Sequence, residues 1–347
     1  MRHVNIPIFI PHMGCPNQCI FCNQRYISGT YQFDESIVDN LINQVLTTVS
    51  KEDECEIAFF GGSFTGIERD LMIRLLDKAQ QYVDKGQVVG IRMSTRPDYI
   101  NEEIIEILKN YTITCVELGI QSMNDSVLKY LKRGHTSKDT INAISLLKQA
   151  GLKFVGQMMI GLPNATVEDE IYTAKTISQM GATGTRIYPT LVFKGTELEE
   201  LTYKGEYIPV SIDEAVKRAA DVLEVFVQNN VSCLRIGLCE SDNLHSEESY
   251  VAGPNVPSIG EMVKSQLYYN LILKSLEKTP FIGCDSLYIE CANGCVSQII
   301  GNKRKNVDNL KKAFGFKYIK VKENFNLMQN QLILKEKEES KYAFKIT

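Results

Sequence analysis

The stretch CEIAFFGGSFTGIERDLMIRLLDKAQQYV, residues 55–83, contains one full repeat of the pattern that decides the fold. Its first part, Cys55–Phe60, is a short apolar run that predicts a buried strand. A Gly-Gly-Ser turn follows, and residues 70–83 carry apolar side chains at helical spacing. A strand, a turn and an amphipathic helix in this order indicate one unit of a parallel α/β sheet.

The same pattern recurs along the chain, with helical stretches such as Ser36–Val49 between the strands. The predicted strands are Val4–Ile10, Cys55–Phe60, Val88–Met93, Thr114–Ile120, Phe154–Ile160 and Thr185–Tyr188. Helical crossovers join parallel strands, so these six units predict an α/β fold. Because no early dinucleotide-binding glycine fingerprint is present, a partial (β/α)6 TIM-type barrel is favoured over a Rossmann sheet.

The character of the chain changes near the passage VAGPNVPSIGE, residues 251–261. We expect a barrel domain over residues 1–250 and a small basic α+β module over residues 251–347. A long helix at 213–227 follows the last predicted strand of the barrel domain. The elements predicted for this module are helices at 261–276, 296–300 and 307–313 and strands at 286–289, 318–322 and 331–335. From residue 301 onward 12 Lys and Arg residues face 5 Asp and Glu residues, although the whole chain has a net charge of −4. This asymmetry permits an anionic partner.

Composition favours a globular protein of a reducing compartment. The chain has 347 residues, and the apolar run near its start is interrupted by Pro7 and Pro11. That run is shorter than a secretory signal or a membrane span, so we expect a cytoplasmic protein without a membrane partner. The chain has ten cysteines, and in such a compartment clustered cysteines indicate metal binding or catalysis more often than disulfides, whereas scattered ones in apolar segments indicate core packing.

Three of these cysteines form a C-x3-C-x2-C array in PHMGCPNQCIFCNQ, residues 11–24. Zinc could take Cys15, Cys19 and Cys22 together with His12, but structural zinc sites usually use two pairs of ligands. An iron–sulfur cluster held by three thiolates leaves one iron free to bind another molecule. Free thiols on a loop would be an oxidation liability. The array therefore favours a cluster, with zinc as the alternative.

Polar or glycine-rich segments follow the predicted strands, where barrel enzymes place their chemistry. They are FFGGSFTG, MSTRPD, ELGIQS with KRGHT one helix later, and GQMMIGLPN. Gly61 and Gly62 allow close backbone approach, and Ser63 supplies a hydrogen-bonding group. Each segment alone has a structural explanation as a turn or cap. Their succession indicates a site for a molecule bound at the open iron.

The motif C-x3-C-x-Phe-C with a later Gly-Gly-Ser resembles radical S-adenosylmethionine enzymes. The segments STRPDY, VELGIQS, LKRGHT, MMIGLPN and RIYPTLVFKGTELEELTYKGEY resemble, more narrowly, the radical domain of the Elongator catalytic subunit and its stand-alone bacterial relatives. That subunit modifies the wobble uridine of tRNA, and the resemblance covers residues 3–265. It implies a partial barrel, a 4Fe–4S cluster, cleavage of S-adenosylmethionine to a 5'-deoxyadenosyl radical, and a reductant such as flavodoxin or ferredoxin.

The resemblance also implies roles for single residues around the cluster and the adenine. Cys15, Cys19 and Cys22 would ligate the cluster. Phe21 would pack near the adenine, and the backbone about Gly161 would line it.

Other implied roles concern the remainder of the cofactor. Gly62 and Ser63, in the same turn as Gly61, would meet the methionine amino group. Gln121 and Arg133 would contact the ribose and the carboxylate. A guanidinium paired with a carboxylate makes a charge-assisted hydrogen bond.

The chain departs from the family in several places. The Elongator subunit continues into an acetyltransferase domain, whereas this sequence ends at Thr347, so we expect a stand-alone relative without that domain. Val256 and Ile259 stand where relatives carry a histidine and an aromatic residue, so no role is carried over to them. Cys284, Cys291 and Cys295 form a looser trio that could bind a second metal, but Cys291 and Cys295 lie in an apolar strand–helix passage, so core packing is favoured.

Three functions compete. The first is a radical S-adenosylmethionine enzyme that modifies tRNA or another RNA, with Lys303, Arg304 and Lys305 among its RNA contacts. The second is radical chemistry on a small metabolite, as in the related oxygen-independent coproporphyrinogen oxidases. The third is a zinc-stabilised RNA-binding protein without catalysis.

Overall fold

The computed structural model describes residues 2–10, 13–15, 19–23, 33–50, 52–238, 249–278, 284–338 and 344–346. Its contacts divide the chain into two compact units. One comprises Met1–Ser211 and Val231–Asn255, and the other comprises Ile212–Asn230 and Val256–Thr347. The single domain boundary expected at residue 250 stays a prediction. None of the described helices is both long and apolar enough to cross a membrane.

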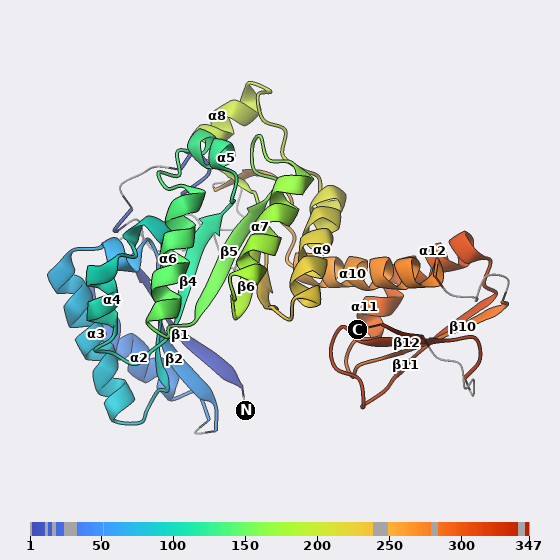
Figure 1. Cartoon of the computed structure of the whole chain (residues 1–347), viewed down its shortest axis with the longest axis horizontal. Coiled ribbons are helices and arrows are strands. Elements are labelled where there is room, and N and C mark those ends of the chain that lie inside the picture. Colours follow the sequence, from blue (N-terminus) through green and yellow to red (C-terminus); the bar gives the residue numbers. More distant parts are fainter. Residues whose placement is uncertain are drawn as a thin grey trace. The chain divides into compact units, whose positions relative to one another are not determined.

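The first unit is built on a seven-stranded parallel sheet with the order β1-β2-β3-β4-β5-β6-β8 (Figure 1). Its strands are β1 (His3–Ile10), β2 (Glu54–Gly61), β3 (Gly90–Thr95), β4 (Ile113–Gln121), β5 (Phe154–Ile160), β6 (Gly184–Pro189) and β8 (Ser232–Ile236). All six predicted strands are present. Because β1 and β8 are the two edges and do not pair with each other, the sheet is an open, partial barrel, as predicted.

Strand β8 is the element of this sheet that the sequence did not reveal. None of its five residues is fully buried, so it lacks the continuous apolar run that marks the inner strands. It pairs with β6 as the last parallel strand. A short antiparallel ribbon of β7 (Val192–Phe193) and β9 (Tyr250–Ala252) completes the strands described in this unit.

Helices cover one face of the sheet, and Figure 1 shows α3, α4, α6 and α7 side by side on that face. The helices of this unit are α2 (Val38–Leu46), α3 (Arg69–Asp84), α4 (Glu102–Leu108), α5 (Asp125–Tyr130), α6 (Ser137–Gln149), α7 (Val167–Gln179) and α8 (Glu197–Tyr203). Short 3-10 helices are η1 (Glu35–Ile37), η2 (Phe64–Gly66) and η3 (Pro97–Tyr99). Capping boxes at Thr136 and Thr166 start α6 and α7, since each hydroxyl accepts from the amide three residues on.

The second unit combines helices with a four-stranded mixed sheet of the order β11-β10-β12-β13. The strands are β10 (Ser286–Cys291), β11 (Tyr318–Glu323), β12 (Leu332–Lys335) and β13 (Phe344–Ile346). The helices are α9 (Ile212–Gln228), α10 (Ile259–Leu276), α11 (Val296–Ile300), η4 (Asn302–Arg304) and α12 (Lys305–Phe314). The predicted α+β character of the C-terminal segment is confirmed.

The core of this second unit contains the later cysteines. Cys291 and Cys295 are buried in a cluster with Ile272 and Leu287, and Cys284 packs against the same cluster. The Tyr268 hydroxyl lies 3.3 Å from the Cys295 sulfur. The expectation of core packing is therefore confirmed for Cys291 and Cys295, whereas Cys284 is half-buried against this cluster.

Candidate active site

The turn after β2 holds the cysteine-bearing loop that follows β1. The Gly62 amide donates to the Ile10 carbonyl at 2.8 Å, and the Ser63 amide donates to the Met13 carbonyl at 3.1 Å. A Cβ on Gly62 would lie 2.1 Å from the Met13 carbonyl oxygen, and a Cβ on Gly14 would lie 2.2 Å from the Ser63 carbonyl oxygen. No side chain fits between these two backbones, so glycine is required at both positions.

The cysteines lie at different depths in this loop. Cys19 is buried, whereas Cys15 and Cys22 are half-buried. The Cys22 amide donates to the Cys19 carbonyl at 3.0 Å, and the Ile20 amide donates to Leu131 at 3.2 Å, which ties the segment to the barrel. Residues 16–18, between the first two cysteines, lie outside the described residues. Within the described ranges, no three His, Cys, Asp or Glu side chains converge as metal ligands, and ligation by the three thiols stays a prediction.

Arg133 lies beside the buried thiol. Its Nη1 is 3.5 Å from the Cys19 sulfur, and its Nη2 donates to the Gly119 carbonyl at the end of β4 at 2.8 Å. The side chain is only 8% exposed, and its Nε has no partner in the described part of the chain. The Arg133 guanidinium therefore places a positive charge against the Cys19 sulfur.

A second arginine reaches the same place from the end of β3. Arg96 is 2% exposed and makes a two-bond contact with Asp98, with distances of 3.0 and 2.9 Å. Burial opposes its charge, but Asp98 outweighs burial, so the pKa of Arg96 is raised. Burial raises the pKa of the Cys15 thiol, and the charges of Arg133 and Arg96 counter part of that rise. Both guanidinium groups therefore act electrostatically on the cysteine loop.

Ser63 is engaged within the protein. Its hydroxyl is fully buried, lies 2.8 Å from the Thr95 hydroxyl and accepts from the Arg96 amide at 3.2 Å. Thr65 extends this chain, with its hydroxyl 2.6 Å from that of Thr95. These contacts join the ends of β2 and β3. The expected contact of Ser63 with a methionine amino group stays a prediction.

Gln121 and His135, together with Arg133, Arg96 and Ser63, form the polar wall of the candidate site. Gln121 ends β4 with a left-handed backbone, φ 67°, which is rare for a residue with a side chain, and its buried Oε1 has no described partner. His135 is 3% exposed, and neither ring nitrogen makes a hydrogen bond to a described residue, although the backbone of Ile120 is near enough to favour the charged form slightly. Burial, with repulsion from Arg133 and Arg96, lowers the pKa of His135 to about 3. The ring is therefore neutral.

These residues share an unusual feature, which is buried polar atoms without partners among the described residues. The atoms are Arg96 Nη1, Gln121 Oε1, Arg133 Nε and both ring nitrogens of His135. Buried polar groups are nearly always hydrogen-bonded in native proteins, so such a concentration calls for a bound polar molecule. A cofactor with amino, carboxylate and ribose groups fits this donor and acceptor set.

An apolar wall stands next to the polar one. Phe21 packs against a cluster that contains Ile20, Met159 and Leu162. Gly161, between the last two, donates its amide to Glu170 at 2.7 Å and accepts from the Tyr207 hydroxyl at 2.7 Å. Phe21 and the Gly161 segment, predicted separately to surround an adenine, thus border one apolar cluster.

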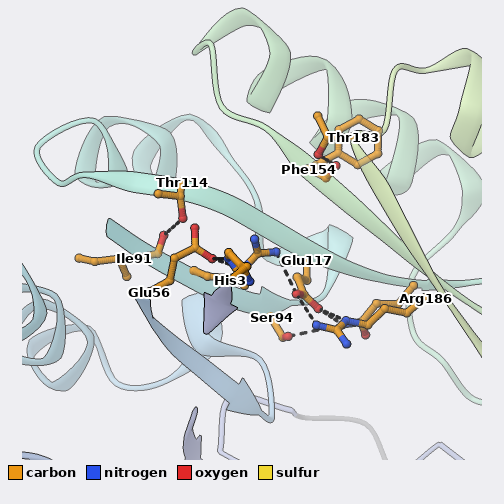
Figure 2. Close-up of polar contacts among 11 residues, drawn as sticks. His3, Glu56, Ile91, Ser94, Thr114, Glu117, Phe154, Thr183 and Arg186 are labelled. Atoms are coloured by element: carbon orange, nitrogen blue, oxygen red, sulfur yellow. Dashed lines mark hydrogen bonds and ion pairs between the residues drawn. The ribbon is translucent and has the colours of Figure 1, made fainter. Parts of the chain in front are cut away.

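A charged network, absent from the sequence-based prediction, crosses the sheet (Figure 2). Glu117 is fully buried and accepts from Arg186 at 2.7 and 3.0 Å and from Arg92 at 3.2 Å. Arg92 also donates to Glu56 at 2.7 Å, and Glu56 lies 2.7 Å from the His3 ring. The sequence did contain a signal for this network, since its charged residues stand inside otherwise apolar strands. This network ties together β1, β2, β3, β4 and β6.

The site agrees with the family to which the chain matches. Residues 9–177 match the model described as the radical SAM superfamily, and residues 182–269 match the radical SAM C-terminal domain. The chain belongs to the radical SAM superfamily, a class of enzymes that bind a 4Fe–4S cluster and S-adenosylmethionine. The predicted enzyme class and cofactors are therefore confirmed, and the zinc alternative is set aside.

Within this superfamily, the chain is similar to several known proteins. The chain is 32% identical over 234 residues to an uncharacterized protein of Methanocaldococcus jannaschii, which covers 63% of this chain and 70% of that protein. It is 35% identical to the tRNA uridine(34) acetyltransferase of Methanocaldococcus infernus, over 48% of this chain and 35% of that protein. Elongator complex protein 3 of Saccharomyces cerevisiae is 31% identical, over 49% of this chain and 34% of that protein. The chain thus spans about a third of the length of these last two relatives.

A solved structure agrees with this relationship. The archaeal Elp3 of Methanocaldococcus infernus superposes with a TM-score of 0.62 at 26% identity, over 79% of this chain and 63% of that chain. The resemblance to the Elongator catalytic subunit is therefore confirmed.

Proposed function

We propose that this radical SAM enzyme modifies tRNA. The observation that carries the proposal is the 35% identity over 185 residues to a tRNA uridine(34) acetyltransferase. That similarity covers 48% of this chain, and the acetyl-transfer step of the relative is not part of the proposal. Reductive cleavage of S-adenosylmethionine is the chemistry that the bound cofactors supply, with a protein such as flavodoxin or ferredoxin as the reductant.

In this proposal the loop after β1 holds the cluster through Cys15, Cys19 and Cys22. Gly62 supports it, because the close approach of its backbone to Met13 fixes where the loop runs. Arg133 places a positive charge 3.5 Å from the Cys19 sulfur. A cation next to thiolate ligands stabilises the more negative state of the site, which favours its reduction.

The side chains with unpartnered atoms position S-adenosylmethionine. Arg133 Nε and Arg96 Nη1, which have no partner among the described residues, are donors for its carboxylate. Gln121 Oε1, which likewise lacks a described partner, is an acceptor for a ribose hydroxyl. Phe21 and the Gly161 segment enclose the adenine through apolar contact.

A comparison of cellular tRNA tests the proposal. Bulk tRNA from cells with and without the gene is digested, and its modified nucleosides are compared by mass spectrometry. We expect one modified nucleoside to be lost on deletion, to return with the wild-type gene and to stay absent with a Cys19→Ala gene. Identical nucleoside profiles would overturn the tRNA assignment and favour a small-metabolite substrate.

A further inference from the structure

The second unit contains a pocket of ≈ 360 Å³ that lies apart from the cysteine loop in the sequence. Its lining includes Tyr288 of β10, Tyr318 and Lys320 of β11, Arg304 at the end of η4 and Lys311 of α12. This volume falls in the range of small-ligand sites. Two aromatic rings and three cations around one hollow are the groups that recognise a base and a phosphate.

The rings of this pocket differ in availability. Tyr318 is 70% exposed, and among the described residues no aromatic or cationic group packs on its ring. Tyr288 already has the Lys320 ammonium 6.0 Å from its ring centroid, and the two residues are partners in the β10–β11 register. Tyr318 is therefore the ring free to stack on a ligand.

The cations differ in the same way. Lys320 is paired with Glu338 at 2.8 Å. Arg304 and Lys311 make no ion pair with any residue that the structure describes. Two uncompensated cations at one pocket are available for an anionic group such as a phosphate.

Backbone conformation and buried hydrogen bonds fix the turn that carries Arg304. Lys303 and Arg304 both have left-handed backbones, with φ of 50° and 66°. Asn306, 6% exposed, holds this turn through hydrogen bonds of 3.0 Å to the Ser265 carbonyl and 3.3 Å to the Gln298 carbonyl. Successive left-handed residues with side chains are strained and persist where surrounding structure imposes them, often at ligand sites.

We propose that this pocket binds one unpaired nucleotide of an RNA strand, with Tyr318 stacked on the base and Arg304 and Lys311 on the adjoining phosphate. The inference rests on the proposed function, because RNA is the substrate class proposed there. A paired duplex does not expose a base for stacking, so the pocket selects single-stranded segments. Of the three adjacent cations Lys303, Arg304 and Lys305, Arg304 is the one that lines the pocket.

The competing explanation is that lysines on β11 protect a sheet edge from aggregation. Strand β11 is an edge of its sheet, and edge lysines serve that purpose in many proteins. Lys317, next to β11 and paired with Asp285 at 3.0 Å, provides the control because it does not line the pocket. Tyr203, 71% exposed on α8, is a matched tyrosine outside the pocket.

The test uses the full chain and fluorescence anisotropy with a labelled twelve-nucleotide oligouridine and with a fully paired RNA duplex. We expect Tyr318→Ala to weaken oligouridine binding roughly 10-fold, as for loss of one stacked base, and Tyr318→Phe to bind as the parent does. Arg304→Gln and Lys311→Gln should each reduce the log–log salt slope by about 0.7. Lys317→Gln and Tyr203→Ala should change the affinity less than 2-fold, roughly.

Two results would overturn the proposed nucleotide site. The first is an oligouridine affinity that Tyr318→Ala leaves unchanged. The second is a loss of oligouridine affinity in Lys317→Gln equal to that in Arg304→Gln, because binding would then depend on general positive charge and not on this pocket. Binding needs neither cofactor nor turnover. A failed pocket therefore leaves the tRNA nucleoside comparison to decide the proposed function, and an unchanged nucleoside profile leaves the pocket standing on its binding data.

Discussion

Replacement of Glu117 by glutamine tests the charged network inside the sheet. The Glu117 carboxylate is fully buried and accepts four hydrogen bonds, two from Arg186 at 2.7 and 3.0 Å, one from Arg92 at 3.2 Å and one from Gln157 at 2.8 Å. Glutamine keeps the shape but removes the charge, and it turns an amide donor toward groups that are themselves donors.

The magnitude follows from what remains after the change. Loss of one member of a buried ion pair typically costs 3–5 kcal/mol, roughly, because the other charge stays buried and uncompensated. Arg92 keeps its 2.7 Å contact with Glu56, so only part of the network loses its counter-charge. We therefore expect Glu117→Gln to lower the free energy of unfolding by about 3 kcal/mol, at the low end of that range.

The assay is urea unfolding of the cluster-free protein under anaerobic, reducing conditions, followed by circular dichroism. Glu103→Gln is the matched control, since Glu103 is 66% exposed in its 3.1 Å ion pair with Arg69. An exposed pair contributes less than about 1 kcal/mol. Equal losses of unfolding free energy for the two variants would refute the reasoning, because burial would then make no difference.

Three further changes address the cysteine loop and its surroundings. Gly62→Ala places a Cβ 2.1 Å from the Met13 carbonyl and should lower cluster content after reconstitution. Gly86→Ala, with no atom within 4 Å but with a φ of +67°, strains the backbone of another turn and should leave cluster content unchanged; equal iron contents would contradict this. Because the pKa of His135 in the folded protein is about 3, only the unfolded chain protonates this imidazole between pH 7 and pH 5. In urea unfolding, lowering the pH from 7 to 5 should therefore reduce the free energy of unfolding of the cluster-free parent by about 2 kcal/mol more than that of His135→Gln; equal reductions in the two proteins would show that the pKa is normal. Arg133→Lys keeps the charge but loses the planar fork and should weaken S-adenosylmethionine binding roughly 10-fold in equilibrium dialysis, with the cluster absorption unchanged; parental affinity would assign Arg133 elsewhere.

Local patterns in the sequence predicted most of the fold. Strands β2 to β6 bury most of their residues and β1 buries Ile6, Ile8 and Ile10, so their apolar composition identifies them. Strand β8 escaped prediction because it is an edge strand whose residues are half-buried or exposed. The helix Ile212–Gln228 was predicted within one residue of each end, but its grouping with residues from 256 onward depends on contacts far apart in the sequence.

Some residues of the candidate site could be predicted from the sequence, and others could not. The cysteines, Gly62, Gln121 and Arg133 were accessible because they stand in short motifs. Arg96 lies in the strand-end segment MSTRPD, to which no single role was assigned from the sequence, and its burial near the cysteine loop is a feature of the folded chain. The partners of Glu117 come from strands 25 and 69 residues away, a pairing that no local pattern encodes.

Formation of 5'-deoxyadenosine tests the central claim most directly. The parent and a variant with Cys15, Cys19 and Cys22 all changed to Ala are reconstituted anaerobically, reduced with dithionite and given S-adenosylmethionine. We expect the parent to hold about four irons per chain and to release 5'-deoxyadenosine, and the variant to do neither, because the three thiolates hold the cluster. A variant that retained the cluster and still cleaved S-adenosylmethionine would contradict the account.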